Sequence, residues 1–361
     1  MRTSQGKIRK YVISMKKILI NTPDINGLGG VANHYKGLKS YWNCRVRYNS
    51  IGPEKFRKIL IPFTIIKYVW YLMTFKPDMV LLNPSLGNTA LHRDFFYLQL
   101  ARLLHKKVSV FIHGFNLDYA ANADWKWIVA NLNKASHIIV LAQSFKDILI
   151  KHGVTVDIQL STTKVPDSMI EGFDVNCRTG EVKSILFLSR IERAKGVFEA
   201  VRTYNLLKVK YPYLKMRMVG NGSALTELKQ FVSDNNIKDI TFTGGLSGQD
   251  VIDEYKNADF FFFTSHGEGM PTVVLEAMAF GLPIVTRAVG GLCDFFEDGK
   301  MGRMTDSKRP EDFAKLIEPY LQDKELTKRT SVNNHQYAKE HFLASKVVRQ
   351  IENILSYDSF V

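Results

Sequence analysis

Residues Ala258–Gly291 read ADFFFFTSHGEGMPTVVLEAMAFGLPIVTRAVGG, which predicts the order strand, loop, helix, strand, loop. The aromatic run Phe260–Thr264 is typical of a strand buried between two layers in a parallel sheet. Pro271 predicts the start of the following helix and Gly281 its end, because proline suits the first helical turn and glycine the residue past the last. The helix N-terminus is therefore expected at the carboxyl end of a buried strand, where open α/β sheets bind ligands and free N–H groups favour an anion.

Two carboxylates flank this helix terminus. Glu268 lies in the loop before the helix, and Glu276 lies about one and a half turns inside it. Acidic side chains beside an anion site need a partner other than the anion, and neutral hydroxyl groups supply one. The pattern thus predicts a ligand that carries both phosphate and hydroxyl groups, as a nucleotide sugar does.

Five ordered motifs resemble the retaining glycosyltransferases of family 4, which have the two-domain GT-B fold. The resemblance is specific over about residues 184–300 and weaker in the N-terminal half. Its residues are the Glu268-x7-Glu276 pair within EGMPTVVLEAMAFGLPIV, SRIERAKG at Ser189–Gly196, VGNG at Val219–Gly222, FTGGL at Phe242–Leu246 and VGGL at Val289–Leu292. It implies an α/β protein with two Rossmann-like, doubly wound domains that face each other across a cleft.

Two cations follow the predicted strand Ser184–Leu188. Arg190 and Lys195 stand on one loop, where they can neutralise the two phosphates of a nucleoside diphosphate as it leaves. No Asp-x-Asp motif occurs in the chain, so we expect these cations to replace a metal ion and expect no cofactor. The catalytic residues expected from the residues and the resemblance together are His113, Arg190, Lys195 and Glu268. The expected donor-binding residues are Gly29, Gly30, Arg190, Lys195, Gly220, Gly244, Leu246, Gly269, Met270, Pro271, Thr272 and Glu276.

The assignment of roles within this set follows the resemblance. It implies that Glu276 binds the ribose hydroxyls and that Glu268, with the backbone of Gly269 and Met270, binds the sugar. His113 follows the predicted strand Val108–Ile112 and is expected beside the transferred sugar, although a lone histidine at a strand end is equally consistent with a structural role. The family's usual glycine before the arginine is Ser189 here, and Met270 replaces its usual aromatic residue or leucine, so the sugar is not identified.

The length of 361 residues suits two domains. We expect an acceptor-side domain at 1–170, a nucleotide-sugar-binding domain at 171–340, and a C-terminal helix within 341–361 that crosses back to the first domain. The boundary falls near residues 165–182, where the hydrophobic periodicity is lost.

The positive charge is concentrated in the first half of the chain. Residues 1–177 contain 24 Lys and Arg against 11 Asp and Glu, whereas residues 178–361 contain 25 against 24. A basic domain suits an anionic membrane or nucleic acid. The apolar segment Phe56–Phe75 is interrupted by Pro62 and Lys67, so it is not a membrane span. Its helical pattern favours packing on the sheet and also fits a membrane interface.

The N-terminal glycine-rich turn leaves an alternative open. Gly27-x-Gly29-x-x-Ala32 fits the dinucleotide fingerprint, which requires an acidic residue about twenty positions later. Arg45 and Arg47 occupy the second strand instead, and no acid follows until Glu54. An arginine can hold the 2′-phosphate of NADP, so an NADP-dependent oxidoreductase remains an alternative.

Cysteine usage and the N-terminus favour the cytoplasm. Cys44, Cys177 and Cys293 show no C-x-x-C spacing and suggest neither a disulfide framework nor a zinc site. Lys16 and Lys17 interrupt the first apolar run before it reaches signal-peptide length, and Met15 is a plausible alternative start.

The function expected from the residues and the resemblance is that of a retaining hexosyltransferase. It would transfer a sugar from a UDP- or GDP-linked donor to a hydroxyl of a lipid-linked saccharide, in the synthesis of a bacterial lipopolysaccharide, capsule or exopolysaccharide, on the cytoplasmic face of the inner membrane. A soluble transferase with a small acceptor is an alternative. A nucleic-acid-binding protein would explain the charge but not the paired carboxylates, so we expect no nucleic-acid partner.

Overall fold

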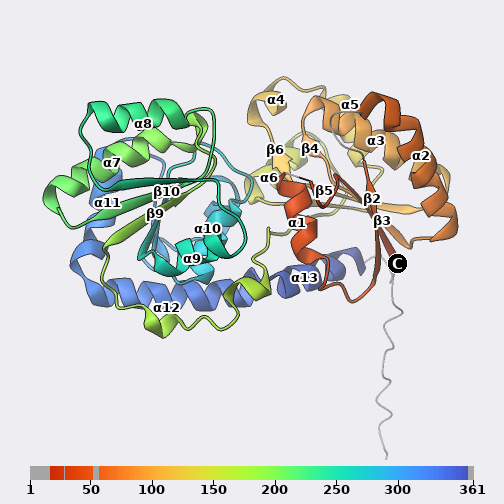
Figure 1. Ribbon diagram of the computed structural model, residues 1–361. Helices are drawn as coiled ribbons and strands as arrows, with labels where there is room; N and C mark the ends of the chain where they lie inside the picture. Colours follow the sequence, from red (N-terminus) through yellow and green to blue (C-terminus); the bar gives the residue numbers. More distant parts are fainter. Residues whose placement is uncertain (1–16, 28, 52–56, 357–361) are drawn as a thin grey trace, which may run out of the picture.

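The computed structural model describes residues 17–27, 29–51 and 57–356, which form two α/β domains side by side (Figure 1). Met15, Lys16, Glu54 and Phe56 lie outside the described residues. Each domain is built on a six-stranded sheet whose described strands are all parallel. This is the doubly wound α/β architecture expected from the sequence.

The first domain has the strand order β2-β1-β3-β5-β7-β8. Alternate residues of its strands face opposite layers: Leu19 packs towards one set of helices and Ile18 towards the other. The strands are β1 (Lys17–Thr22), β2 (Arg45–Ser50), β3 (Met79–Leu82), β5 (Lys107–Ile112), β7 (His137–Val140) and β8 (Ile158–Leu160). One face carries α2 (Arg57–Thr74), α3 (Asn88–Leu103), α5 (Trp125–Leu132) and α6 (Gln143–Lys151), and the other carries α1 (Gly30–Leu38) and α13 (Ala344–Ser356). A short ribbon of β4 (Ser85–Leu86) and β6 (Gly114–Phe115), followed by α4 (Leu117–Ala121), lies beyond the main sheet.

The second domain has the strand order β11-β10-β9-β12-β13-β14. All four residues of β12 are phenylalanines and all are buried, because Phe260 and Phe262 face one helical layer and Phe261 and Phe263 face the other. The strands are β9 (Ser184–Leu188), β10 (Lys215–Val219), β11 (Ile240–Gly244), β12 (Phe260–Phe263), β13 (Ile284–Arg287) and β14 (Gly302–Thr305). The helices are α7 (Val197–Lys210), α8 (Leu225–Asp234) and α11 (Pro310–Gln322) on one face, and α9 (Gln249–Asn257), α10 (Thr272–Ala279) and α12 (Lys324–His341) on the other.

Each sheet has a topological switch point, where the chain changes the direction in which it adds strands. In the first sheet it lies between β1 and β3, and in the second between β9 and β12. Ligands of open α/β sheets bind beyond the carboxyl ends of the strands at such points. The loops after β9 and β12, which carry the predicted cations and Glu268, therefore flank the switch point of the second sheet.

The last helix packs on the first domain. After α12, the chain runs along the lower side of the molecule into α13, which lies beside α1 (Figure 1). Val347, Val348 and Ile351 of α13 are fully buried in a cluster with residues of the first sheet. The carboxylate of Glu352 also accepts hydrogen bonds from the backbone N–H groups of Asn43 (2.8 Å) and Cys44 (3.0 Å).

Helix α2 is buried on one face only. Tyr68 and Leu72 pack in the core, as expected for a helix on the sheet. Along its outer face runs a row of large apolar side chains that are more than half exposed: Phe63 (67%), Ile66 (66%), Trp70 (55%) and Met73 (57%). In the part of the chain that the structure describes, no helix is both long and apolar enough to span a bilayer.

Candidate functional site

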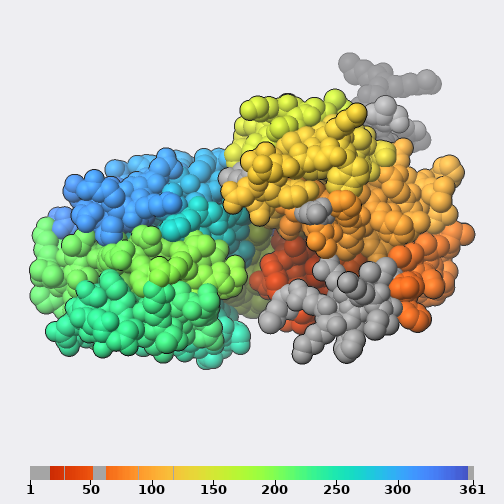
Figure 2. All heavy atoms as spheres, turned by 90° about the horizontal axis from the view of Figure 1, so that it is seen from above, coloured from red at the N-terminus to blue at the C-terminus, as the bar shows by residue number. Residues whose placement is uncertain are grey.

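A cavity of about 280 Å³ lies where the two domains meet. Viewed from above, the domains are separate lobes joined along one boundary (Figure 2). The cavity is lined by Gly30, Val31, Asn33, His34, Ser85, His113, Gly114 and Leu141 of the first domain, by Thr163 and Lys164 of the segment between the domains, and by Glu268, Gly269, Met270 and Thr272 of the second. It thus brings together residues from the carboxyl ends of both sheets and the N-termini of α1 and α10.

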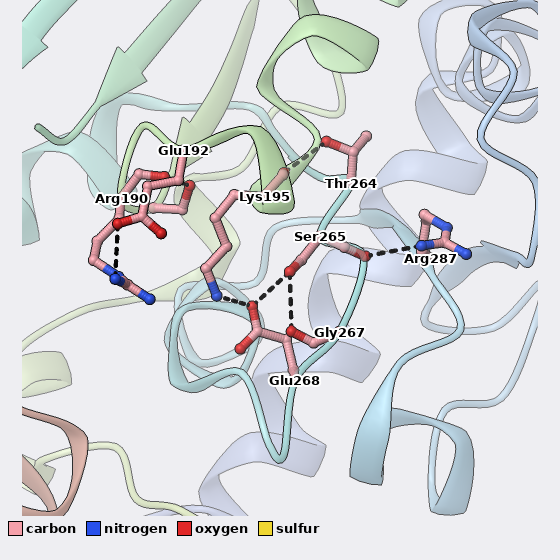
Figure 3. Close-up of polar contacts among 9 residues, drawn as sticks. Arg190, Glu192, Lys195, Thr264, Ser265, Gly267, Glu268 and Arg287 are labelled. Carbon is pink, nitrogen blue, oxygen red and sulfur yellow. Dashed lines mark hydrogen bonds and ion pairs between the residues drawn. The ribbon is translucent and has the colours of Figure 1, made fainter. Parts of the chain in front are cut away.

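Lys195 and Glu268 form an ion pair at the edge of this cavity (Figure 3). Lys195 ends the short 3-10 helix η4 (Arg193–Lys195) after β9, and Glu268 lies in the loop after β12. Ser265 donates a hydrogen bond from Oγ to Oε1 of the same carboxylate at 2.7 Å. The expected phosphate-binding cation and the expected sugar-binding carboxylate are therefore partners of each other.

The loop after β12 is held on both sides. Thr264 donates from Oγ1 to the carbonyl of Gly196 at 2.7 Å, which joins it to the start of α7. The N–H of Gly291, in the VGGL turn, donates to the carbonyl of Gly269 at 2.7 Å. The two motifs beside Glu268 therefore fix the position of this loop.

Arg190 lies apart from the ion pair. Its guanidinium contacts the carboxylate of Glu192 at 2.8 Å and its side chain is 69% exposed (Figure 3). Gly220, beside it, is required for close packing, since a Cβ there would lie 1.8 Å from the carbonyl oxygen of Ser189. Among the predicted donor-binding residues, those that do not line the cavity are Gly29, Arg190, Lys195, Gly220, Gly244, Leu246, Pro271 and Glu276.

Glu276 is a partly buried carboxylate on α10. Tyr255 donates its hydroxyl proton to Oε2 at 2.8 Å. Burial raises the pKa of Glu276 above its ordinary value, while the ammonium of Lys164 and the hydroxyl of Tyr255 act in the opposite direction. The carboxylate is thus placed between a tyrosine and a lysine that the sequence reasoning did not identify.

His113 is held by a buried amide. Its Nε2 lies 3.0 Å from Oδ1 of Asn83, which also accepts the hydroxyl proton of Tyr35 at 2.6 Å. The amide nitrogen of Asn83 donates to the carbonyl of Asn21 at 3.0 Å, so Oδ1 is the acceptor and Nε2 carries the proton. Burial lowers the pKa of His113 to about 3, so the imidazole is neutral at physiological pH and Nδ1 is an acceptor.

The glycine-rich turn leads into α1, whose first turn contains no acidic residue. Gly29 caps this helix with a φ of 131°, a backbone conformation that favours glycine, and Gly30 lines the cavity. Arg47, one of the two β2 arginines that could bind the 2′-phosphate of NADP, lies instead over the rings of Tyr71 and Phe75, 4.9 Å from each centroid. That packing weakens the dinucleotide alternative.

Sequence reasoning missed several cavity residues that carry hydrogen-bonding or charged groups, among them Lys164 and His34. Lys164 follows β8, a three-residue strand too short for the periodicity to reveal. His34 lies one turn inside α1, where its position among helical residues gave no sign of a binding role. A search for polar residues just past the last strand of the first sheet would have found Lys164 and Thr163, whose hydroxyl is 3.2 Å from that of Thr272.

Within residues 17–27, 29–51 and 57–356, no group of three or more His, Cys, Asp or Glu side chains is placed to hold a metal ion. Cys44, Cys177 and Cys293 are free thiols.

Comparisons with known proteins agree with this architecture. Residues 173–337 match the family described as glycosyl transferases group 1. The chain is 31% identical over 144 residues to the D-inositol 3-phosphate glycosyltransferase of Paenarthrobacter aurescens, an alignment that covers 38% of this chain and 35% of that protein. It is 22% identical over 263 residues to the capsular polysaccharide biosynthesis glycosyltransferase CapM of Staphylococcus aureus, covering 72% and 65%. The matches thus span less than two thirds of the length of these relatives.

Among solved structures, HepE of Anabaena in complex with UDP and glucose superposes with a TM-score of 0.69 at 18% identity, covering 94% of this chain and 99% of that one. This likeness concerns the fold, and it extends over both domains. Residues 173–337 are therefore similar to the glycosyl transferases group 1 family, and the chain has the GT-B fold.

Proposed function

We propose that this protein is a retaining glycosyltransferase of family 4 that transfers a sugar from a nucleoside diphosphate sugar to a hydroxyl group. The observation that carries the proposal is the paired Lys195 and Glu268 beside the N-terminus of α10, at the edge of a cavity shared by both domains. A cation and a carboxylate at one helix terminus match the phosphates and hydroxyls of such a donor.

In the proposed complex the donor lies mainly on the second domain. Glu276 accepts hydrogen bonds from the ribose, and Lys195 and Arg190 bind the diphosphate. For this, the exposed Arg190 side chain must turn away from Glu192. Glu268 and the backbone at Gly269 and Met270 bind the sugar, and His113 accepts a hydrogen bond from a sugar hydroxyl through Nδ1.

The chemical step breaks the bond between the anomeric carbon and the diphosphate oxygen. The leaving diphosphate gains negative charge, which fixed cations stabilise more than they stabilise the bound donor, so they lower the barrier. We propose that these cations do this without a metal ion.

Retention of configuration by double displacement would require a carboxylate nucleophile below the sugar ring. Among the described cavity-lining residues, Glu268 is the one carboxylate, and it is engaged by Lys195 and Ser265. This supports attack by the acceptor from the same face as the departing diphosphate, whose phosphate accepts the acceptor's proton.

The donor nucleotide is tested by a thermal-shift screen against UDP, GDP, ADP, CMP and NADP without added metal. We expect stabilisation by one nucleoside diphosphate, and UDP is our first candidate because HepE was solved with it. A shift with NADP alone would contradict the proposal and favour an oxidoreductase. Binding to RNA that survives moderate salt would instead favour a nucleic-acid-binding protein.

The acceptor we propose is a lipid-linked saccharide in the synthesis of a bacterial surface polysaccharide. The similarity to CapM supports a polysaccharide, whereas the similarity to a transferase named for inositol phosphate supports the alternative of a small soluble acceptor. Transfer of radiolabelled sugar into the organic phase of a membrane extract would support the lipid-linked acceptor, and label confined to the aqueous phase would support the small one.

We also propose that the protein binds an anionic membrane through the outer face of α2. The row of Phe63, Ile66, Trp70 and Met73 supplies exposed apolar area on one helix face, which suits an interfacial position. The surrounding sequence, residues 57–107, contains eight Lys and Arg and two Asp, and Asp94 is buried. Each basic residue near an anionic bilayer contributes about 1 kcal/mol of attraction.

Vesicle sedimentation tests this surface. We expect the protein to sediment with phosphatidylglycerol vesicles, to bind phosphatidylcholine vesicles less, and to lose binding with Phe63→Ser and Trp70→Ser together. Val209→Ser is the matched control, because Val209 is 81% exposed on the second domain. Unchanged sedimentation of the α2 variant would contradict the proposal. If the wild type is a dimer and the α2 variant is a monomer, the face instead binds a second copy of the chain.

A further inference from the structure

Lys164 is a buried lysine that forms no direct ion pair in the described part of the chain, although the charge of Glu276 acts on it. It lies between β8 and the second domain, its residue is 2% exposed, and its side chain lines the interdomain cavity. Among the described residues no ion pair within 4 Å involves its ammonium, and Glu276 is the carboxylate whose charge acts on it from farther away. A buried charge without a directly paired opposite charge is costly, so a function is needed to explain its position.

The fold makes room for this lysine. Gly37 lies inside α1, where glycine costs about 1 kcal/mol relative to alanine. A Cβ at Gly37 would lie 2.2 Å from Cε and 2.8 Å from Cδ of Lys164. The missing side chain of Gly37 therefore allows the lysine stem to pass across the helix into the cavity.

A second cavity residue has unused hydrogen-bonding groups. His34 is 3% exposed and lines the cavity, yet neither ring nitrogen has a hydrogen-bond partner. Its ring packs edge-on against that of His113, with centroids 4.9 Å apart. Burial, followed by His113 and the ammonium of Lys164, lowers the pKa of His34 well below its ordinary value, so the ring is neutral and offers one donor and one acceptor.

The surroundings of Lys164 favour an anion. The N-terminal residues Gly30 of α1 and Thr272 of α10 both line the cavity, and neither helix has an acidic residue in its first turn. Helix N-termini attract phosphate groups. Two such termini, the Lys164 ammonium and an imidazole without hydrogen-bond partners thus surround one space, which is also lined by the Glu268 carboxylate that Lys195 neutralises.

We propose that Lys164 binds the diphosphate of the donor as a third cation, supplied by the segment between the domains, and that His34 donates a hydrogen bond to the same ligand. This inference rests on the proposed function, because it assigns the cavity to a nucleoside diphosphate. It assigns to Arg190 and Lys195 the second-domain side of the diphosphate and to Lys164 the side that faces α1.

The test is the affinity of the full-length protein for UDP, measured by calorimetry. Lys164→Met keeps the unbranched stem beside Gly37 and removes the charge. A hydrogen bond to a charged group contributes about 1.5–3 kcal/mol, so we expect UDP affinity to fall about ten- to a hundredfold. His34→Phe should weaken UDP binding by a smaller factor. Lys36→Met, an exposed lysine of α1, is the control with the same change in net charge and should bind UDP as the wild type does.

Two further readouts separate binding from a structural role. Loss of the buried charge should leave the melting temperature of the ligand-free Lys164→Met protein equal to or above that of the wild type. Burial also lowers the pKa of Lys164, so wild-type UDP affinity should fall as pH rises towards the ordinary lysine range, and more steeply than that of Lys164→Met. Lys164→Gln provides a second neutral variant. Equal UDP affinities of wild type and both variants would overturn this inference alone, whereas a wild type that binds no nucleoside diphosphate would overturn the proposed function.

Discussion

Lys195 and Glu268 form an ion pair that joins the two strands flanking the switch point of the second sheet, although they are 73 residues apart in sequence. Each side chain is only 16% exposed, so the pair is shielded from most solvent. In the proposed complex, the donor diphosphate therefore shares the Lys195 ammonium with the Glu268 carboxylate.

Separate substitutions of this pair should affect binding and turnover differently. Lys195→Met should weaken UDP binding about tenfold or more, because it removes a phosphate partner. Glu268→Gln releases Lys195, so UDP affinity should be kept or increased while turnover falls about a hundredfold. Calorimetry and initial rates measure the two effects. Lys300→Met, which breaks an exposed pair with Glu297, is the control. Parallel losses of UDP affinity in both variants would contradict separate roles for the two residues.

Nucleotide binding should depend on the protonation of Glu276. Burial raises the pKa of Glu276, so this carboxylate is protonated at a higher pH than an exposed glutamate. The protonated side chain accepts fewer hydrogen bonds from the ribose. UDP affinity should fall as pH decreases below neutral, and Tyr255→Phe should move that loss to higher pH because it removes a donor to the carboxylate. The raised pKa also means that the folded state binds this proton more tightly than the unfolded chain, so the residue's contribution to stability increases as pH falls through that pKa.

The check is a series of UDP titrations between about pH 5 and pH 8. Glu276→Gln should bind UDP more weakly and with less pH dependence. If Tyr255→Phe does not shift the pH at which UDP affinity is lost, a group other than Glu276 controls the pH dependence.

Arg178 should be important for stability, not chemistry. Its buried guanidinium donates to backbone carbonyls at the C-terminal ends of α9 and α10, including Tyr255 at 2.8 Å and Phe280 at 2.9 Å. Arg178→Met leaves these carbonyls without their partner, and we expect a loss of about 3 kcal/mol in the free energy of unfolding. Urea unfolding should be followed by circular dichroism, since all four tryptophans lie in the first domain. The exposed Arg329→Met should change little, and an equally small change at Arg178 would refute its role.

Gly37 and Lys164 should be coupled. In the wild type, Gly37→Ala should displace the lysine stem and reduce UDP affinity. In a Lys164→Ala background the same change should leave UDP affinity unaffected and stabilise the helix by about 0.5–1 kcal/mol. A double-mutant cycle of UDP affinity and melting temperature measures the coupling. Additive effects on affinity would show that the glycine serves another purpose.

The strand and helix order was predictable from sequence because both sheets are parallel and buried, so that their strands appear as apolar runs. Phe260–Phe263 is the clearest case, and Pro271 and Gly281 bound the next helix closely. The positions of Glu268 and Lys195 at strand ends follow from the same reasoning. Their ion pair does not, because sequence spacing contains no information on which side chains meet across two loops.

The rest depended on contacts between distant segments. Lys164 follows a strand of three residues, and its role is visible only beside Gly37 of α1. For α2 the sequence left packing on the sheet and contact with a membrane interface both open, because it does not show that β2 and α3 cover only part of the helix. The apolar residues on the uncovered part became the proposed membrane surface.

The crossing of α13 has a consequence for synthesis on the ribosome. Ile18, Leu81 and Phe111 lie against Val347 and Ile351, so one face of the first sheet is covered by residues translated more than two hundred positions later. Until those residues emerge, that face stays open to chaperones and to association with other nascent chains. Removal of residues 344–356 should therefore cause the first domain to aggregate during expression, even though the sequence of its own strands is intact.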